Sequence, residues 1–420
     1  MENNEFRKIK DIVKFCKIKV PYYHNLLNRF ELNSVPDFGK IPLLTNKIYC
    51  NNTPPVSNSL LSRKASGCFV FSSGGTTSEP RYILRDFADF DYQIQDYEGL
   101  NLGPNDTVIN LFMPGLWGIF TSANITLMRL GCRIIPFGGT NLTEKDKHKI
   151  IDLIGQFKAN TLLGVPSTIL AVARYIFLNS HYRAICPLVN KIFTLGEGIH
   201  PSSFRFMRQV FPNAVIKSKY GTMESAGIAY QCRYLNRNYY HPFHNRFVEI
   251  VDINSNQSLP SGKKGLIVVT TLNPRLVPLI RFSTGDIGWL FKKSCPCGEK
   301  QILKIGGRSQ DMVISASVHF SLDRIESIIS SFSELNPPVF QIEITNPRGI
   351  DEITLHIEGS KVTRQLKKEV LKKLYQEITD IPEALFSGKI LRFEIDFVAI
   401  GSISRIPSTG KIKKIIDLRK

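Results

Sequence analysis

A run of small hydroxyl residues and glycines in the first quarter of the chain could bind phosphate. It consists of Ser72, Ser73, Gly74, Gly75, Thr76 and Thr77. Glycine lets the backbone adopt positive φ and approach a ligand closely, so that successive N–H groups and hydroxyls can face one anion. The run lacks the G-x-x-x-x-G-K-[ST] pattern of a P-loop. It therefore predicts a phosphate-binding loop of another kind, and a plain Gly/Ser turn is the alternative.

Four further residues combine thiol and imidazole groups that suit a zinc ion. Cys295 and Cys297 are separated by one residue, and Cys232 and His241 lie upstream of them. Thiolates and imidazole favour tetrahedral Zn²⁺, although the C-x-C spacing is tighter than the usual one. His244 is an alternative fourth ligand, and a reduced, metal-free cysteine pair is the alternative to a site. The hypothesis is a structural Zn²⁺ that ties the surrounding strands together.

The elements that must position these groups alternate between strand and helix from residue 84 to residue 200. Strands are predicted at 107–112, 132–136, 161–166 and 191–195, with helices at 86–100, 118–130, 143–157 and from 167 onwards. This alternation indicates a largely parallel sheet that is covered by helices. Ligands gather at the carboxyl ends of such strands, where residues 164–167, 196–198 and 220–224 are expected to lie.

The pattern changes towards the C-terminus. From about residue 247, shorter alternating strands with turns suggest an antiparallel, barrel-like subdomain. A glycine-marked break at 306–311 precedes a compact α+β unit of about 110 residues, in which an apolar stripe marks a helix at 362–378. We predict an α/β fold with a large N-terminal domain of parallel-rich sheets and helices, residues 1–310, and a small C-terminal α+β domain, residues 311–420.

The composition narrows the function. The chain has 420 residues, 43% hydrophobic and 21% charged, as is typical of an ordinary globular protein. Its net charge of +18 comes from lysines that mix with acids along the chain, which favours anionic small molecules over nucleic acid as partners. The sequence has no apolar run of about 18 residues and no signal-peptide pattern, so we expect no membrane span and a cytoplasmic location. Eight cysteines in a long chain of this kind argue against a disulfide framework.

Five motifs in a fixed order resemble the signatures of adenylate-forming enzymes, the superfamily of acyl-CoA synthetases, adenylation domains and luciferases. They span residues 72–80, 220–224, 281–286, 307–311 and 408–411. The segments at 21–23, 41–47 and 295–298 are similar to those of the phenylacetate–CoA ligase branch. The resemblance covers nearly the whole chain. It implies that ATP activates a carboxylic acid as an acyl-adenylate, which is then transferred to a thiol, with CoA as the expected acceptor.

The resemblance also implies roles for single residues. The loop from Ser72 to Thr77 would hold the β- and γ-phosphates, Glu224 would hold Mg²⁺, and Lys411 would place its cation between the substrate carboxylate and the α-phosphate. The nucleoside and α-phosphate contacts would come from Gly196, Glu197, Tyr220, Gly221, Thr222, Asp286 and Arg308. Asp311 would be the hinge of a mobile C-terminal lid. An aryl or similar hydrophobic acid would lie against Phe112, Trp117, Ile119, Phe120, Val165 and Ala226.

Several positions depart from the family pattern. Glu79 stands where the phosphate-binding loop usually has lysine, and Arg81 could substitute for that lysine. Ser317 stands where the family usually has glycine, beside which the thiol of CoA passes. A carrier-protein thiol, an amine or a protein acceptor is therefore an alternative to CoA, and a non-catalytic nucleotide-binding homologue is a second alternative. Taken singly, Asp286 could merely cap a turn and Lys411 could be a surface lysine. A homodimer is expected, but no motif addresses it.

Overall fold

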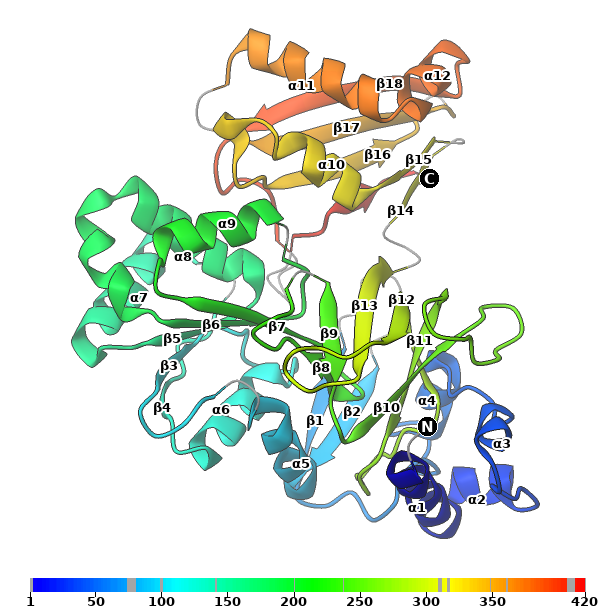
Figure 1. Ribbon diagram of the computed structural model, residues 1–420. Helices are drawn as coiled ribbons and strands as arrows, with labels where there is room; N and C mark the ends of the chain where they lie inside the picture. Colours follow the sequence, from blue (N-terminus) through cyan, green and yellow to red (C-terminus); the bar gives the residue numbers. More distant parts are fainter. Residues whose placement is uncertain are drawn as a thin grey trace.

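The computed structural model describes residues 3–73, 81–98, 101–139, 142–199, 201–236, 238–308, 312–315, 318–347, 349–359, 362–405 and 412–419. Figure 1 shows a large N-terminal region and a smaller C-terminal region that lies beside its helices α8 and α9. This arrangement confirms the predicted α/β fold with a separate C-terminal α+β unit. In the described residues, no helix is both long enough and apolar enough to cross a membrane.

One eleven-stranded sheet forms the framework of the N-terminal region. Its strand order is β10-β11-β12-β13-β9-β8-β7-β6-β5-β3-β4. The strands from β7 to β4 pair in parallel, and those from β7 to β10 pair antiparallel. The expected barrel-like strands thus continue the parallel strands in one hydrogen-bonded order. The strand bounds are β3 (Thr107–Asn110), β4 (Arg133–Ile135), β5 (Thr161–Gly164), β6 (Lys191–Leu195), β7 (Val215–Thr222), β8 (Ala226–Tyr230), β9 (Tyr239–Pro242), β10 (Arg246–Val251), β11 (Lys264–Thr271), β12 (Phe282–Lys292) and β13 (Gln301–Arg308).

Helices cover both faces of the parallel half because successive strand residues point to opposite faces. Ile109, Leu162 and Ile192 pack with helices on one face, whereas their neighbours Leu163 and Phe193 pack with helices on the other. The first face carries α7 (Glu144–Phe157), α8 (Pro166–Leu178), the 3-10 helix Ser180–Leu188 and α9 (Pro201–Val210). The second carries α5 (Phe87–Glu98) and α6 (Ile119–Arg129) (Figure 1).

The first 60 residues pack against the antiparallel half. Their helices are α1 (Asn3–Lys19), α2 (Pro21–Leu27), α3 (Val35–Gly39) and α4 (Asn46–Asn52). Buried apolar residues of these helices form one core with residues of β8, β10, β11 and β12. A separate antiparallel pair, β1 (Cys68–Ser72) and β2 (Tyr82–Asp86), leads into and out of the predicted phosphate loop. Residues 74–80 of that loop lie outside the described residues.

The C-terminal region has its own four-stranded sheet and its own core. The sheet order is β18-β17-β16-β19, and helices α10, α11 and α12 contribute to the core. The predicted stripe of helix 362–378 is buried at Leu366, Val370, Leu374 and Ile378, whereas Val362 is exposed. The bounds are β14 (Met312–Ser315), β15 (Val318–Ser321), α10 (Leu322–Ile329), the 3-10 helix Ser333–Leu335, β16 (Phe340–Thr345), β17 (Asp351–Glu358), α11 (Arg364–Glu377), α12 (Asp380–Phe386), β18 (Ile390–Val398) and β19 (Ile415–Asp417). The predicted hinge, Asp311, lies outside the described residues.

A buried arginine connects the end of helix α3 to the sheet. Arg281 is 1% exposed, and its guanidinium donates to Glu249 at 3.3 Å and to the carbonyl oxygens of Gly39 and Ile41 at 2.5 and 2.6 Å. Burial raises the pKa of Glu249, and the charge of Arg281 opposes that rise. The pair therefore places opposite charges together inside the core, and Arg281 satisfies the carbonyl oxygens of Gly39 and Ile41 at the same time.

We predict that Arg281→Met destabilises the protein by about 3–5 kcal/mol, because it leaves the Glu249 carboxylate buried without its partner. Urea unfolding followed by circular dichroism measures this loss. Lys40→Met is the matched control, because it also removes a cation from an ion pair, but from the exposed pair with Asp37. We expect the control to match the parent; equal effects of the two changes would contradict the structural role of Arg281.

Candidate active site

A cleft of about 860 Å³ lies between the N-terminal and C-terminal regions. Its N-terminal wall includes the carboxyl ends of β6 and β7, with Gly196, Glu197, Tyr220 and Gly221. Strands far along the chain add to this wall, and the C-terminal region closes the opposite side. The cleft thus lies at the position that the alternating strands and helices predicted for a ligand.

Tyr220 and Asp286 meet in this cleft although 66 residues separate them. The Tyr220 hydroxyl donates to Asp286 Oδ2 at 2.7 Å. Asp286 is 8% exposed, and its backbone N–H donates to the Thr284 hydroxyl at 3.1 Å. Two residues predicted to contact the nucleoside are therefore brought together at one place. Arg308 pairs with Asp286 in the β12–β13 ladder, so its backbone lies at the same place.

Gly196 and Glu197 follow β6 directly. Gly196 has φ of +93°, a conformation that glycine adopts without strain. The Glu197 carboxylate accepts from the backbone N–H and the hydroxyl of Ser167, both at 3.0 Å, at the first turn of α8. Both residues border the cleft beside Tyr220. The predicted nucleotide residues at the ends of β6 and β7 thus share one wall.

Gly221 is fixed by close backbone packing. A Cβ atom at this position would lie 2.2 Å from the carbonyl oxygen of Ala226, because β7 turns back into β8 at this point. The Thr222 hydroxyl lies 3.0 Å from that of Ser225 and accepts from the Ser225 backbone N–H at 3.2 Å. These contacts shape the tight turn that presents Glu224.

Glu224 is buried in the β7–β8 turn, next to the base of the predicted phosphate loop. Arg81 Nε donates to Glu224 Oε1 at 2.8 Å. Ser73 and Arg81 close the base of the loop, with Ser73 N–H donating to the Arg81 carbonyl at 2.8 Å and Arg81 N–H donating to the Ser73 hydroxyl at 3.2 Å. Ser73 is therefore connected to Glu224 through Arg81, and Ser72 precedes it as the last residue of β1. Gly74, Gly75, Thr76 and Thr77 lie outside the described residues.

Three arginines that the sequence analysis missed hold the Glu224 turn in place. Arg246 and Arg275 both donate to the carbonyl oxygen of Ser225, at 3.1 and 2.8 Å, and Arg85 donates to that of Met223. All three are buried. The charge of Arg275 also lowers the pKa of buried Asp89, although burial dominates and leaves that pKa raised. A signal existed for Arg246, because it begins the mostly apolar segment 246–251, and the structure buries every residue of that segment.

A buried lysine also borders the cleft directly before Tyr220. Lys219 is 7% exposed, and its Nζ lies 3.5 Å from the ring centroid of Tyr97. A cation over an aromatic face is attracted by the electron density of the ring. The sequence analysis did not single out this lysine. It adds a positive charge to a wall on which Glu197 and Asp286 are negative.

The C-terminal wall of the cleft includes residues that flank the predicted catalytic segment in the sequence. Arg405 and Ile412 pair as an antiparallel bridge and both border the cleft, so they flank residues 406–411. Lys411 itself lies outside the described residues. Lys414 also borders the cleft and lies 3.7 Å from Glu326. Burial raises the pKa of Glu326, and Lys414 partly opposes the rise.

The residues predicted to line an acid pocket are distributed differently. Phe112 and Val165 are buried in the core between the sheet and helices α5 and α6, and Ile119 and Phe120 pack against that core. Trp117 is half-buried, and Ala226 is the first residue of β8, with φ of +64°. Among the described residues that line the cleft, none of these six appears.

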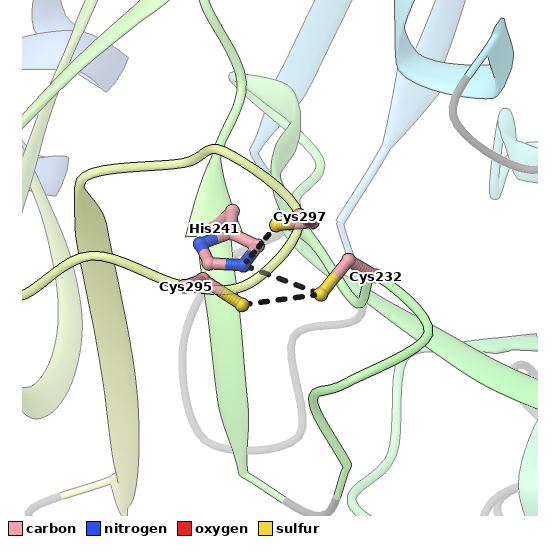
Figure 2. A group of neighbouring side chains, drawn as sticks. All are labelled: Cys232, His241, Cys295 and Cys297. Carbon is pink, nitrogen blue, oxygen red and sulfur yellow. Dashed lines mark hydrogen bonds between the residues drawn. The ribbon is translucent and has the colours of Figure 1, made fainter.

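The four predicted zinc ligands converge. Figure 2 shows His241 facing the three thiols of Cys232, Cys295 and Cys297, and all four ligand atoms lie within 4.8 Å of one another. His241 Nε2 lies 3.4 Å from Cys232 Sγ and 3.3 Å from Cys297 Sγ, and the sulfurs of Cys232 and Cys295 are 3.7 Å apart. His244 is instead largely exposed and lies 3.2 Å from Glu299.

This geometry fits a tetrahedral metal ion. Zn–S bonds of about 2.3 Å place two sulfurs about 3.8 Å apart on a tetrahedron, and a sulfur and a nitrogen about 3.5 Å apart. The observed separations are close to both values. His241 Nδ1 lies 2.6 Å from the carbonyl oxygen of Gln301, which leaves Nε2 to face the sulfurs. The residues present therefore suit zinc, and they connect the loop between β12 and β13 to β8 and β9.

The comparisons with known proteins identify the family of the chain. The family model described as AMP-binding enzyme matches residues 44–273, and the AMP-binding enzyme C-terminal domain matches residues 323–419. A phenylacetate-coenzyme A ligase of Thermus thermophilus is 26% identical over 98% of this chain and 95% of its own.

Among solved structures, 2-hydroxyisobutyryl-CoA ligase in the postadenylation state, bound to 2-HIB-AMP, is similar with a TM-score of 0.82 at 18% identity, over 98% of this chain and 88% of its own. The same ligase in the thioesterification state, with 2-HIB-AMP and CoA, gives a TM-score of 0.66 at 19% identity, over 100% and 90% of the two chains. The first family model alone matches more than half of the chain, and the second matches its C-terminal region. The chain therefore belongs to the family of AMP-binding, adenylate-forming enzymes that its ordered motifs resemble.

Proposed function

We propose that this protein is an ATP-dependent acid–CoA ligase that activates a hydrophobic, aryl-type carboxylic acid. A carboxylate oxygen of the acid attacks the α-phosphorus of ATP, and pyrophosphate leaves, which gives an acyl-adenylate. The sulfur of CoA then attacks the acyl carbon, AMP leaves, and the thiol proton passes to solvent. The phenylacetate-coenzyme A ligase relative, which aligns along almost its whole length, supports this choice of acid and acceptor.

One observation carries the proposal. Tyr220 and Asp286 are hydrogen-bonded on one side of the cleft, and Ile412, the residue after Lys411, lines the other side. We assign Tyr220, Asp286, Gly196, Glu197 and Arg308 to the nucleoside, with Gly221 and Thr222 near the α-phosphate. We assign Lys411 to the charge that develops between the carboxylate and the α-phosphate.

The phosphate end of the site follows from the contacts of Glu224. We propose that residues 72–77 bind the β- and γ-phosphates and that Glu224 holds Mg²⁺, which takes carboxylate and phosphate oxygens as ligands. Arg81 already donates to Glu224, so the ion and the Arg81 guanidinium would compete for this carboxylate. Release from Glu224 would let Arg81 turn towards phosphate, in place of the lysine that Glu79 replaces. We place the reaction in the cytoplasm, where ATP and free thiols are available.

We predict that Lys411→Ala lowers acid-dependent pyrophosphate exchange by about 100-fold or more, because removal of one group that stabilises transition-state charge has effects of this size. Lys413→Ala is the matched control, because Lys413 is an exposed lysine two positions away. Exchange in the control should equal that of the parent. Adenylate formation by Lys411→Ala at the parental rate would refute the assigned role.

The substrate and the acceptor are tested together by hydroxamate trapping across a panel of carboxylic acids, followed by thioester assays with CoA and with a carrier-protein thiol. We expect arylacetic and similar hydrophobic acids to form adenylates, and CoA to accept the acyl group. Adenylation followed by transfer to the carrier protein alone would replace CoA as the acceptor. Nucleotide binding without exchange for any acid would instead favour a non-catalytic homologue.

We further propose that Cys232, His241, Cys295 and Cys297 hold a structural Zn²⁺. Elemental analysis of protein purified without chelator should find near-stoichiometric zinc, and Cys297→Ala should lose zinc and melt at a lower temperature, since metal binding contributes to folding free energy. Cys50→Ala is the matched control, because Cys50 is a partly buried cysteine outside the group. A parent protein without zinc, or zinc retained by Cys297→Ala, would contradict the site.

A further inference from the structure

A polar seam joins the C-terminal region to helices α8 and α9. Arg174 on α8 donates to Glu358 Oε2 at 3.2 Å and also donates to the carbonyl oxygen of Pro337. Arg405 donates to the carbonyl oxygen of Ser167 at 3.5 Å, and the hydroxyls of Ser330 and Ser202 lie 3.1 Å apart. These contacts connect residues of the C-terminal region with the side of the sheet that carries Glu197.

The Arg174–Glu358 pair is the buried charge pair of this seam. The side chains of Arg174 and Glu358 are 16% and 5% exposed. Removal of one partner from such a buried ion pair strongly destabilises the protein, because the remaining charge stays desolvated. The pair therefore favours one orientation of the C-terminal region. The two charges neutralise each other when α8 and the end of β17 are in contact, and each charge must be hydrated when these elements separate.

Glu358 also holds the chain that leads to the catalytic lysine. Its second oxygen, Oε1, accepts from the backbone N–H of Ile403 at 3.3 Å. Ile403 lies two residues before Arg405, whose bridge with Ile412 flanks the segment that contains Lys411. One carboxylate thus contacts α8 through one oxygen and the base of the Lys411 segment through the other.

The orientation that this pair favours is the one suited to adenylation. The Lys411-flanking residues Arg405 and Ile412 border the same cleft as Tyr220 and Asp286. Over the whole chain, the TM-score is 0.82 against the 2-hydroxyisobutyryl-CoA ligase in its postadenylation state and 0.66 against the same ligase in its thioesterification state.

We propose that Arg174 and Glu358 are positioning residues for the adenylation step: their ion pair docks the C-terminal region on α8 and sets the Lys411 segment against the nucleotide. This role rests on the proposed function. The pair forms in the adenylation orientation and opens when the C-terminal region turns to admit the thiol. Neither residue needs to touch the substrate, because both act through the position of Lys411.

The test separates the two half-reactions. In Glu358→Gln, the amide oxygen can still accept from Ile403, but the charge that Arg174 requires is gone. We expect kcat for acid-dependent pyrophosphate exchange to fall about tenfold, as for the loss of one charge-assisted hydrogen bond, whereas KM for ATP stays near the parental value. Transfer from synthetic acyl-adenylate to CoA should be unchanged or faster. Arg174→Gln should behave in the same way, and the double variant should be no worse than the more affected single variant, because the two residues act as one unit.

Glu352→Gln is the matched control. Glu352 lies on the same strand, β17, and pairs with Arg392 at 2.6 Å inside the C-terminal region. Its substitution by glutamine also removes one carboxylate from an ion pair, but from a pair that is not part of the seam. Both half-reactions should be unchanged in this variant. Equal losses in both half-reactions of Glu358→Gln, or an unchanged exchange rate, would overturn the proposal. If Glu358→Gln does not fold, Arg174→Gln replaces it: loss of exchange with unchanged transfer supports the proposal, and equal losses or unchanged exchange contradict it.

A readout independent of activity distinguishes failure of this inference from failure of the proposed function. Cysteines introduced at Ser202 and Ser330 should form a disulfide across the seam under mild oxidation, which peptide mapping by mass spectrometry detects. We expect high cross-linking in the parent and Glu352→Gln backgrounds and much less in Glu358→Gln. Cross-linking that is insensitive to Glu358→Gln would refute the docking role, whether or not an acid substrate is found.

Discussion

Strand β7 is hydrogen-bonded to a parallel neighbour on one side and to an antiparallel neighbour on the other, and the site depends on this constraint. The parallel partner, β6, ends at Gly196 and Glu197, so both carboxyl ends open at one edge of the sheet. The antiparallel partner, β8, forces the chain into a tight turn directly after Tyr220 and Gly221. The backbone hydrogen bonds of β7 with β6 and β8 therefore position both the residues assigned to the nucleotide and the turn that carries Glu224.

The tight turn itself requires support from distant parts of the chain. A turn that exposes the carbonyl oxygens of Met223 and Ser225 to the protein interior would leave them without water, and buried acceptors need partners. Arg85, Arg246 and Arg275 supply the donors from β2, β10 and the segment after β11. The cations also surround a turn that carries the carboxylate of Glu224. The support of the turn and its local electrostatics thus come from the same side chains.

The sequence predicted those features that follow from local pattern and missed those that need long-range packing. Period-2 and period-3.6 apolar patterns located the strands and helices, and the position of motifs at strand ends was enough to expect that Tyr220 and Glu197 share one wall.

The close spacing of Cys295 and Cys297 made a metal site worth predicting, but only the β8–β9 pairing selects His241 over His244. Phe112 and Val165 are buried in a core, and hydrophobicity alone does not tell an apolar residue that packs at a strand end from one that lines a pocket, so their assignment to the acid pocket stays a prediction. The pairing of Arg174 with Glu358 could not be predicted from the sequence around either residue, because the two side chains meet only where the N-terminal and C-terminal regions are in contact.

In the reaction cycle that we propose, the two regions part between the half-reactions, and a seam between them cannot then be built like a core. An extended apolar interface would favour one orientation too strongly, whereas exposed ion pairs contribute little and would leave the orientation undefined. A single buried pair flanked by hydroxyls and backbone carbonyls lies between these limits. Its charges are hydrated when the regions separate, which compensates for much of the attraction lost, so that the two orientations remain within reach of what a ligand can shift. The polar character of the contacts of Arg174, Ser202 and Arg405 is therefore what a domain that alternates between two half-reactions requires.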